Sequence, residues 1–185
     1  MIEVEIKLPV TDRKIIEDKL KQLGLEAGDL VEERDIYFTS DLYDFKQADK
    51  ALRIRKTKNI KTDKTQAFLT YKGNRLDKIS MTREELETGI EDGDVGEKIL
   101  KSIGFRAVSP VCKLRQYYFL GELTVCVDQV DSLGLFLEAE IIVSLEEERE
   151  SALQQIENFL EKLGYSMEET TRVSYLSMLQ EKKLQ

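Results

Sequence analysis

Charged side chains alternate with aliphatic ones at the start of the chain, and this pattern is the chemical feature that organises the sequence. The charged positions are Glu3, Glu5 and Lys7. In a strand, successive side chains point to opposite faces, so these three share one face and the aliphatic residues share the other. Paired carboxylates can bind a hard divalent cation, and a neighbouring lysine can bind an anion.

Later segments repeat the alternation. Their charged faces hold Arg53 and Arg55; Lys72; Arg83, Glu85 and Glu87; Lys113 and Arg115; Asp128; and Glu138 and Glu140. For any single strand, a sheet with one solvated face produces the same pattern. Here, however, cations dominate some strands and paired carboxylates mark the first and the last. We therefore expect a barrel whose polar lining brings these groups into one cavity.

Such a cavity suits a polyphosphate and a metal ion. Arginine offers planar bidentate donors to phosphate oxygens and lysine a compact charge, so the cations predict a site for three linked phosphates. The predicted phosphate ligands are Arg53, Arg55, Lys72, Arg83, Lys113 and Arg115. The carboxylates supply hard oxygen ligands that suit Mg²⁺ or Mn²⁺. Alternatively, the acidic side chains only form ion pairs with the basic ones. The two interpretations are compatible, because the residues of a binding site can pair with one another while the site is empty.

Composition excludes several functional classes. A net charge of -8 argues against a non-specific nucleic-acid binder, which needs a basic surface. The absence of histidine excludes His-based triads and His-ligated metals. No leader and no apolar run near the ~18 residues of a membrane span is visible, so we expect a cytoplasmic protein that does not bind membranes. The isolated Cys112 and Cys126 are interpreted as reduced core residues.

The hydrophobic periodicity predicts one domain over residues 1–185 that mixes strands and helices. The expected strands are 2–8, 31–39, 51–56, 66–72, 77–87, 110–119, 123–130 and 135–143. The expected helices are 11–23, 94–103, 147–163 and 168–183. A polar loop is expected over 40–50. The directions of Arg34, Asp35 and Tyr37 stay open.

Taken in order, these motifs resemble the CYTH superfamily, also called triphosphate tunnel metalloenzymes. The resemblance begins with the Glu-x-Glu-x-Lys signature at Glu3, Glu5 and Lys7 and covers nearly the whole chain. It continues through Arg53-x-Arg55, Lys72-Gly73, Arg83-x-Glu85, Lys113-x-Arg115, Asp128-x-Val130, Leu133-Gly134-x-Phe136-x-Glu138-x-Glu140 and the tail Ser174-Tyr175-Leu176. The opening signature alone is weak, but the ordered series is specific.

The resemblance implies an α+β fold, an eight-stranded antiparallel β-barrel that forms a tunnel with helices packed outside. A triphosphate would lie lengthwise along the arginines and lysines. The metal would bind to Glu3, Glu5, Glu138 and Glu140 with Asp128 nearby. Lys7, Glu5 and Asp128 would take part in catalysis, and Glu85 would support the charge network.

In size and motif spacing the chain looks most like the class IV adenylyl cyclase branch, which implies conversion of ATP to cyclic AMP and pyrophosphate. Related members instead hydrolyse inorganic, thiamine or nucleoside triphosphates, and the shared motifs do not separate these activities. In a hydrolase, a metal-bound or Lys7-oriented water would attack the terminal phosphorus. A third alternative is a module that binds polyphosphate or nucleotide without turnover. The oligomeric state, including a homodimer, stays open.

Overall fold

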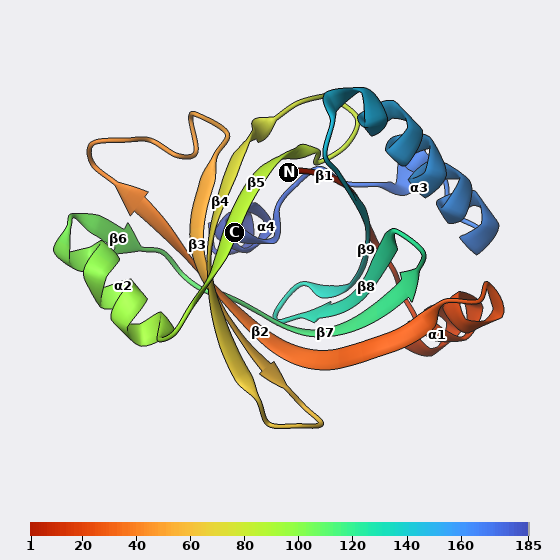
Figure 1. Ribbon diagram of the computed structural model, residues 1–185, viewed down its shortest axis with the longest axis horizontal. Coiled ribbons are helices and arrows are strands. Elements are labelled where there is room, and N and C mark those ends of the chain that lie inside the picture. The colour runs from red at the N-terminus through yellow and green to blue at the C-terminus, as the bar shows by residue number, and fades with distance from the viewer. Residues whose placement is uncertain (185) are drawn as a thin grey trace.

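A closed barrel of eight antiparallel strands forms the centre of the protein (Figure 1). The structure is a computed structural model, and it describes residues 1–184. Around the barrel the order is β3-β4-β5-β1-β9-β8-β7-β2, and β2 pairs again with β3 to close the ring. This confirms the expected α+β tunnel fold. The strands are β1 (Ile2–Pro9), β2 (Glu26–Ser40), β3 (Ala51–Asn59), β4 (Thr65–Arg75), β5 (Arg83–Ile90), β6 (Phe105–Ala107), β7 (Val111–Leu120), β8 (Leu123–Val130) and β9 (Gly134–Val143).

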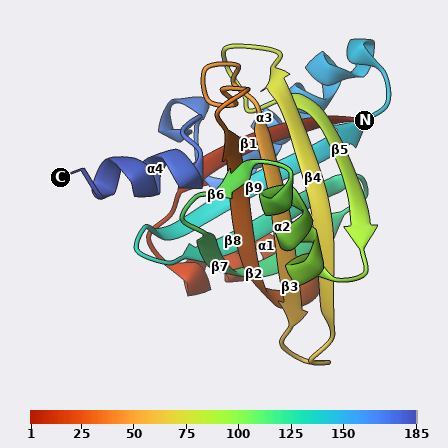
Figure 2. The ribbon, with the colours of Figure 1, turned by 90° about the vertical axis from the view of Figure 1, so that its left-hand side faces the viewer.

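Helices lie outside the barrel or across its end. They are α1 (Arg13–Gln22), α2 (Gly93–Ser102), α3 (Arg149–Leu163) and α4 (Tyr175–Lys182). Helix α3 packs against β1, β9 and α1, and α2 packs against β3, β4 and β6. Helix α4 lies at one end of the barrel, as Figure 2 shows. The barrel is therefore enclosed at its sides and partly covered at one end.

The aliphatic face of β1 forms the core on the outside of the barrel. Val4, Ile6 and Leu8 are buried there against residues of strands β8 and β9 and of helices α1 and α3. Because side chains alternate along a strand, burying this face outward turns the charged face of β1 into the barrel. The predicted division of faces is confirmed.

The expected strand over 77–87 is displaced. Strand β5 begins only at Arg83, and the residues before it form a loop. The Asp77 carboxylate accepts hydrogen bonds from the backbone N–H groups of Ile79 and Ser80, at 2.8 and 2.7 Å. A side chain that bonds its own following backbone favours a turn over a strand.

The expected helix over 168–183 is also shorter than predicted. Only α4 is regular, and it follows a single 3-10 turn (Met167–Glu169) and an extended stretch. In this stretch the Thr171 N–H donates to the Lys7 carbonyl at 2.8 Å. The backbone of the tail is thus used to bond β1, which is incompatible with a helix there.

Three features of β2 were not expected from the sequence. The strand begins at Glu26, well before residue 31, and carries a bulge between Ala27 and Leu30. The C-terminal end of β2 pairs with the short strand β6.

Within residues 1–184 no helix is long and apolar enough to cross a lipid bilayer. Both cysteines are free, Cys126 fully buried and Cys112 half-buried.

Candidate active site

A cavity of about 800 Å³ occupies the barrel interior. The predicted charged residues line it together, although they come from six strands that are spread over the whole sequence. They are Glu3, Glu5, Lys7, Arg53, Arg55, Lys72, Arg83, Glu85, Lys113, Arg115, Glu138 and Glu140. Asp128 is fully buried behind this surface and is not part of the lining.

Two carboxyl groups face each other across β1 and β9. The antiparallel register sets Glu5 opposite Glu140, and Lys7 opposite Glu138. Burial and the charges of Glu138 and Glu3 raise the pKa of Glu5 to about 7. Burial and the charge of Glu3 raise the pKa of Glu140 to about 8. Within residues 1–184 neither carboxyl group has an ion-pair partner, and the nearby charges of Lys72, Lys7 and Arg115 do not outweigh burial and the neighbouring carboxylates.

Lys72 on β4 links the first strand to β5. Its Nζ lies 2.6 Å from Glu3 Oε2 and 2.6 Å from Glu85 Oε2. Burial alone would raise the pKa of Glu3, but the charge and hydrogen bond of Lys72 outweigh it and lower the pKa to about 2. Glu3 is thus ionised and engaged by a lysine. Glu85 takes part in this ion-pair network, and its supporting role in the site stays a prediction.

Arg115 on β7 is held by Asp128 on β8. Arg115 Nε and Nη2 donate to the two Asp128 oxygens at 2.7 and 2.6 Å, and Nη2 also contacts Glu138. The hydroxyl of Tyr175 in α4 donates to Asp128 Oδ2 at 3.1 Å. Lys113 Nζ lies 3.5 Å from the same oxygen. In this position Asp128 orients two cations, and its assignment as metal ligand or catalytic group stays a prediction.

Two further carboxylates point into the barrel from β2, and sequence reasoning missed Glu33 and left Asp35 open. Asp35 accepts two hydrogen bonds of 2.7 Å from Arg55 and one of 3.3 Å from Arg53. Glu33 Oε2 lies 3.2 Å from both Arg55 Nη2 and Lys113 Nζ. The sequence pattern that could have identified both carboxylates is the period of two, because Glu33, Asp35 and Tyr37 occupy one face of the strand.

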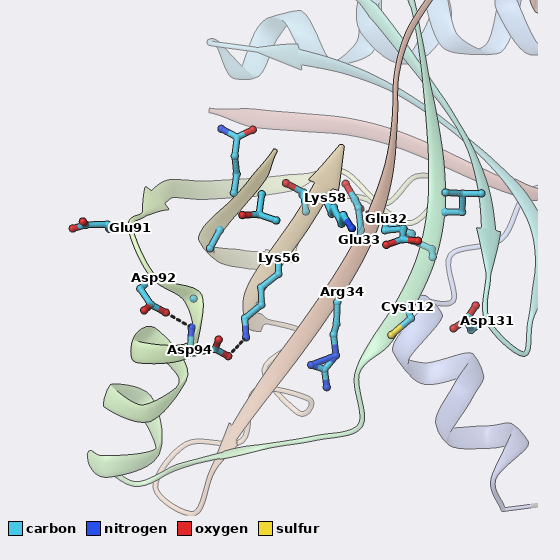
Figure 3. Close-up of a pocket in the computed structure, with 17 residues that line it drawn as sticks. Glu32, Glu33, Arg34, Lys56, Lys58, Glu91, Asp92, Asp94, Cys112 and Asp131 are labelled. Carbon is cyan, nitrogen blue, oxygen red and sulfur yellow. Dashed lines mark hydrogen bonds and ion pairs between the residues drawn. The ribbon is translucent and has the colours of Figure 1, made fainter. Parts of the chain in front are cut away.

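Arg34, between these carboxylates, points outward. It lines a second cavity, of about 710 Å³, on the outer side of β2 and β3 beside the start of α2 (Figure 3). Lys56, which also lines this cavity, is paired with two acids: its Nζ lies 2.5 Å from Asp94 and 2.6 Å from Glu97. Tyr37 lines the tunnel cavity. The outer face of β2 therefore lines the second cavity, whereas most of the motif residues line the tunnel.

Two of the predicted phosphate ligands differ in how their guanidinium groups are used. Arg53 Nε is buried and has no hydrogen-bond partner within residues 1–184. Arg83 instead donates to the carbonyls of Gly73 and Met81, at 3.2 and 3.4 Å. A buried donor without a partner is costly, so Arg53 favours an incoming acceptor. Arg83 anchors the loop before β5 while it lines the cavity.

Comparison with known proteins decides the family. A family model described as the CYTH domain matches residues 1–175. The chain belongs to the CYTH family. A protein of Methanocaldococcus jannaschii, provisionally named an adenylate cyclase, is 39% identical over 178 residues, which cover 96% of this chain and 98% of the relative. The adenylate cyclase CyaB of Aeromonas hydrophila is 26% identical over 180 residues, which cover 97% and 89%.

Solved structures have the same CYTH architecture. A protein of Pyrococcus horikoshii OT3 has a TM-score of 0.89 at 35% identity, and the match covers 97% of this chain and 99% of the other. A protein of Hippeastrum, provisionally named an adenylyl cyclase and described as having a dominant triphosphatase activity, has a TM-score of 0.68 at 17% identity. That match covers 98% and 95% of the two chains and shows the fold alone.

The CYTH cavity fits a divalent metal ion in its donor chemistry. Glu5 and Glu140 are hard oxygen donors in register, and their raised pKa values reflect burial together with neighbouring carboxylates. Within the described chain, no three acidic or thiol side chains are already grouped around one point. A bound ion would therefore need further carboxylates of the cavity to move toward it, and would take its remaining ligands from water or substrate, as Mg²⁺ commonly does.

Proposed function

We propose that this CYTH protein is a metal-dependent enzyme that acts on the phosphate chain of a triphosphate, and specifically an adenylyl cyclase that converts ATP to cyclic AMP and pyrophosphate. The observation that carries the proposal is the pairing of Glu5 with Glu140 inside a cavity whose lining also includes six arginine and lysine side chains of the predicted phosphate site. The adenylate cyclase names of two relatives, which align over nearly the whole chain, support the choice of reaction.

The cations would hold the phosphates, and the buried carboxylates would hold the cations. Arg55 and Arg115 each use two nitrogens on an aspartate, Asp35 and Asp128 respectively. A guanidinium carries five N–H donors, so each arginine keeps donors for phosphate oxygens. Because the two aspartates fix the orientation of the guanidinium groups, the arginines would lose little side-chain entropy when phosphate binds. The other proposed phosphate ligands are Arg53, Lys72, Arg83 and Lys113.

We assign Glu3, Glu5, Glu138 and Glu140 to hold Mg²⁺ or Mn²⁺, with Asp128 behind them. The ion would neutralise phosphate charge and lower the pKa of an attacking hydroxyl or water. Lys7 lies beside this set, its Nζ 4.0 Å from Glu138 Oε1. Burial lowers the pKa of Lys7, and Tyr175 covers it with the ring centre 4.4 Å from Nζ. Lys7 would orient the reacting oxygen beside the carboxylates that hold the metal ion.

A triphosphatase is the second candidate, and the Hippeastrum structure favours it, because a protein with this fold is described as having that activity. The two reactions differ in the phosphorus that is attacked. In the cyclase, the ribose 3′-oxygen bonds to the α-phosphorus and pyrophosphate leaves. In the triphosphatase, water attacks the terminal phosphorus and orthophosphate leaves.

One incubation series tests the proposal. The protein is incubated with ATP, inorganic triphosphate or thiamine triphosphate, each with Mg²⁺ or Mn²⁺, and the products are resolved by chromatography. Cyclic AMP with pyrophosphate identifies the cyclase, and orthophosphate release identifies the hydrolase. Parallel reactions with a chelator serve as the control. Turnover that persists in chelator, or no turnover of any of the three substrates, contradicts the proposal.

A further inference from the structure

Arg75, the last residue of β4, bridges two other segments of the chain. Its Nε and Nη2 donate to the two carboxylate oxygens of Asp49, at 2.9 and 2.7 Å, and its backbone N–H donates to Asp49 Oδ2 at 3.0 Å. Its Nη1 donates to the carbonyl of Arg172 at 3.0 Å. These contacts, the Arg75 clamp, link β4 to the loop before β3 and to the tail before α4.

A shift in strand register turns Arg75 toward the tunnel cavity. Lys72 pairs with Glu85, and Arg75 pairs with Arg83, so β4 has one residue more than β5 between these pairs. With regular alternation, Arg75 would face away from the side of Lys72, which lies three positions earlier. With the extra residue, Arg75 lines the same cavity as Lys72. Bulges of this kind re-aim a side chain and are common beside active sites.

The Asp49 arm of the clamp fixes the turn that leads into β3. Asp49 has a φ of 52°, in the left-handed region that few residues other than glycine adopt. The Lys50 N–H donates to the Phe45 carbonyl at 2.8 Å and closes the turn. In this conformation the Asp49 carboxylate reaches Arg75, and the chain continues into β3, which carries the proposed phosphate ligand Arg53.

The other arm fixes the backbone that places Tyr175. The bonded carbonyl of Arg172 lies three residues before Tyr175, in a stretch without regular secondary structure. Beside it, the Thr171 N–H donates to the Lys7 carbonyl at 2.8 Å. Tyr175 covers Lys7 with its ring and donates its hydroxyl to Asp128. Because no helix or strand sets the path of this stretch, its bonds to other segments determine where Tyr175 lies.

Direct phosphate binding is the alternative role for Arg75. All three of its guanidinium nitrogens, however, donate to protein acceptors, whereas Arg53 Nε is without a partner in the described chain. We propose that Arg75 is a positioning residue of the active site, which fixes the tail so that Tyr175 holds Lys7 in place for the reaction. This inference rests on the proposed function and adds to it a residue outside the proposed phosphate and metal ligands.

The test measures kcat and KM of Arg75→Ala and Arg75→Lys with ATP, inorganic triphosphate and thiamine triphosphate in the presence of Mg²⁺. Arg75→Ala is also made in a Tyr175→Ala background. The matched control is Arg106→Ala, because Arg106 forms a similar two-nitrogen ion pair with Asp41 at the start of the same loop, and its side chain is exposed. Circular dichroism and thermal unfolding check that each variant is folded.

We expect both Arg75 variants to lower kcat roughly tenfold to hundredfold and to change KM less than about twofold, because Lys7 shifts while the phosphate ligands are kept. Lysine should not rescue, since one compact ammonium replaces the planar fork that joins the two segments. In the Tyr175→Ala background, Arg75→Ala should cause no further loss. An unchanged kcat, a raised KM alone, or a full further loss in that background would overturn the proposal.

Hydrogen exchange tests the clamp without turnover. In Arg75→Ala the backbone amide of Thr171 should exchange at least about fivefold faster, because the tail has lost a hydrogen bond, and Arg106→Ala should leave the rate unchanged. If the unmodified protein turns over none of the three triphosphates, the proposed function fails, and faster exchange at Thr171 still supports the clamp. Unchanged exchange would show that Arg75 does not fix the tail and would overturn the inference.

Discussion

Glu5 on β1 and Glu140 on β9 are direct partners in the antiparallel register, so two acidic side chains point side by side into the barrel. Opposite residues in such a pair have Cβ atoms about 4.5–5.5 Å apart, and like charges at that spacing destabilise the sheet. Burial is the main cause of the raised pKa of both groups, and neighbouring carboxylates add to it, Glu138 and Glu3 for Glu5, and Glu3 and Glu5 for Glu140. A divalent cation bound here would offset this accumulation of carboxylates, which is why the pair is central to the proposed chemistry.

Replacing either member of this pair should separate metal use from phosphate binding. We expect Glu5→Gln or Glu140→Gln to lower kcat at least roughly hundredfold, because a metal ligand is lost. Binding of inorganic triphosphate in chelator, measured by calorimetry, should be unchanged or tighter, because negative charge is removed. Glu150→Gln, at an exposed position of α3, is the control. A Glu5→Gln variant that retains full metal-dependent activity would contradict the metal role.

Arg53 should contribute to phosphate binding directly. We expect Arg53→Ala to reduce the rise in Tm that inorganic triphosphate produces, since ligand stabilisation falls as Kd rises. Loss of one charge-assisted contact should weaken binding by roughly one order of magnitude. Lys58→Ala, on the same strand but exposed, should leave the rise intact. A normal Tm rise in Arg53→Ala would remove this residue from the phosphate site.

Asp128 should matter for stability whatever the reaction is. Asp128→Leu leaves the buried side chains of Arg115 and Lys113 without one of their carboxylate partners. Breaking a buried ion pair on one side typically costs about 3–5 kcal/mol of unfolding free energy. Urea unfolding measures this cost. Tyr175→Phe, which removes only the hydroxyl hydrogen bond to Asp128, should cost about 1 kcal/mol. A loss for Asp128→Leu no larger than that of Tyr175→Phe would contradict this account.

We expect Glu33 to make the free energy of unfolding depend on pH in the acidic range. Burial would raise the pKa of Glu33, but Arg55, Lys113 and Arg115 outweigh it and lower the pKa from 4.5 to about 2. A depressed pKa stabilises the folded state above the unfolded value, and this stabilisation is lost as pH falls from 4.5 toward 2.

We therefore expect Glu33→Gln to be less stable than the unmodified protein at pH 7, and the difference to shrink as the pH approaches 2. Unfolding by urea at a series of pH values measures it. The neighbouring Glu32→Gln is the matched control, because Glu32 is exposed and should give a difference near zero at every pH. A difference for Glu33→Gln that is constant with pH would contradict the charge interaction.

The barrel and most of its lining could be predicted from the sequence, because a period of two fixes which residues share a face. Lys72 and Arg115, for example, stand on charged faces and line the cavity as expected. Closure of the ring could not be derived from periodicity alone, since a solvated sheet face has the same pattern. The expectation of a barrel came instead from the charges gathered on these faces, and the expectation of eight closed strands came from the ordered motifs, which resemble a known family.

Tertiary contacts account for what the sequence did not reveal. The loop before β5 looked like a strand, but Arg172 from the tail binds the carbonyls of Asp77 and Ser80 at 2.7 and 2.9 Å. No local pattern can report a partner about ninety residues away. Asp128 carried the motif of a metal ligand, yet its environment depends on Arg115 and Tyr175, which only the folded chain brings together.

Strand β1 finds its main neighbour, β9, only at the far end of the sequence, and the Lys7 carbonyl is bonded by Thr171. Because translation runs from the N-terminus, the residues of β1 leave the ribosome before those of β9 and of the tail. Unpaired strand edges tend to associate unless charged side chains discourage it. We therefore expect the row of Glu3, Glu5 and Lys7 to discourage association of this segment until β9 is available for pairing.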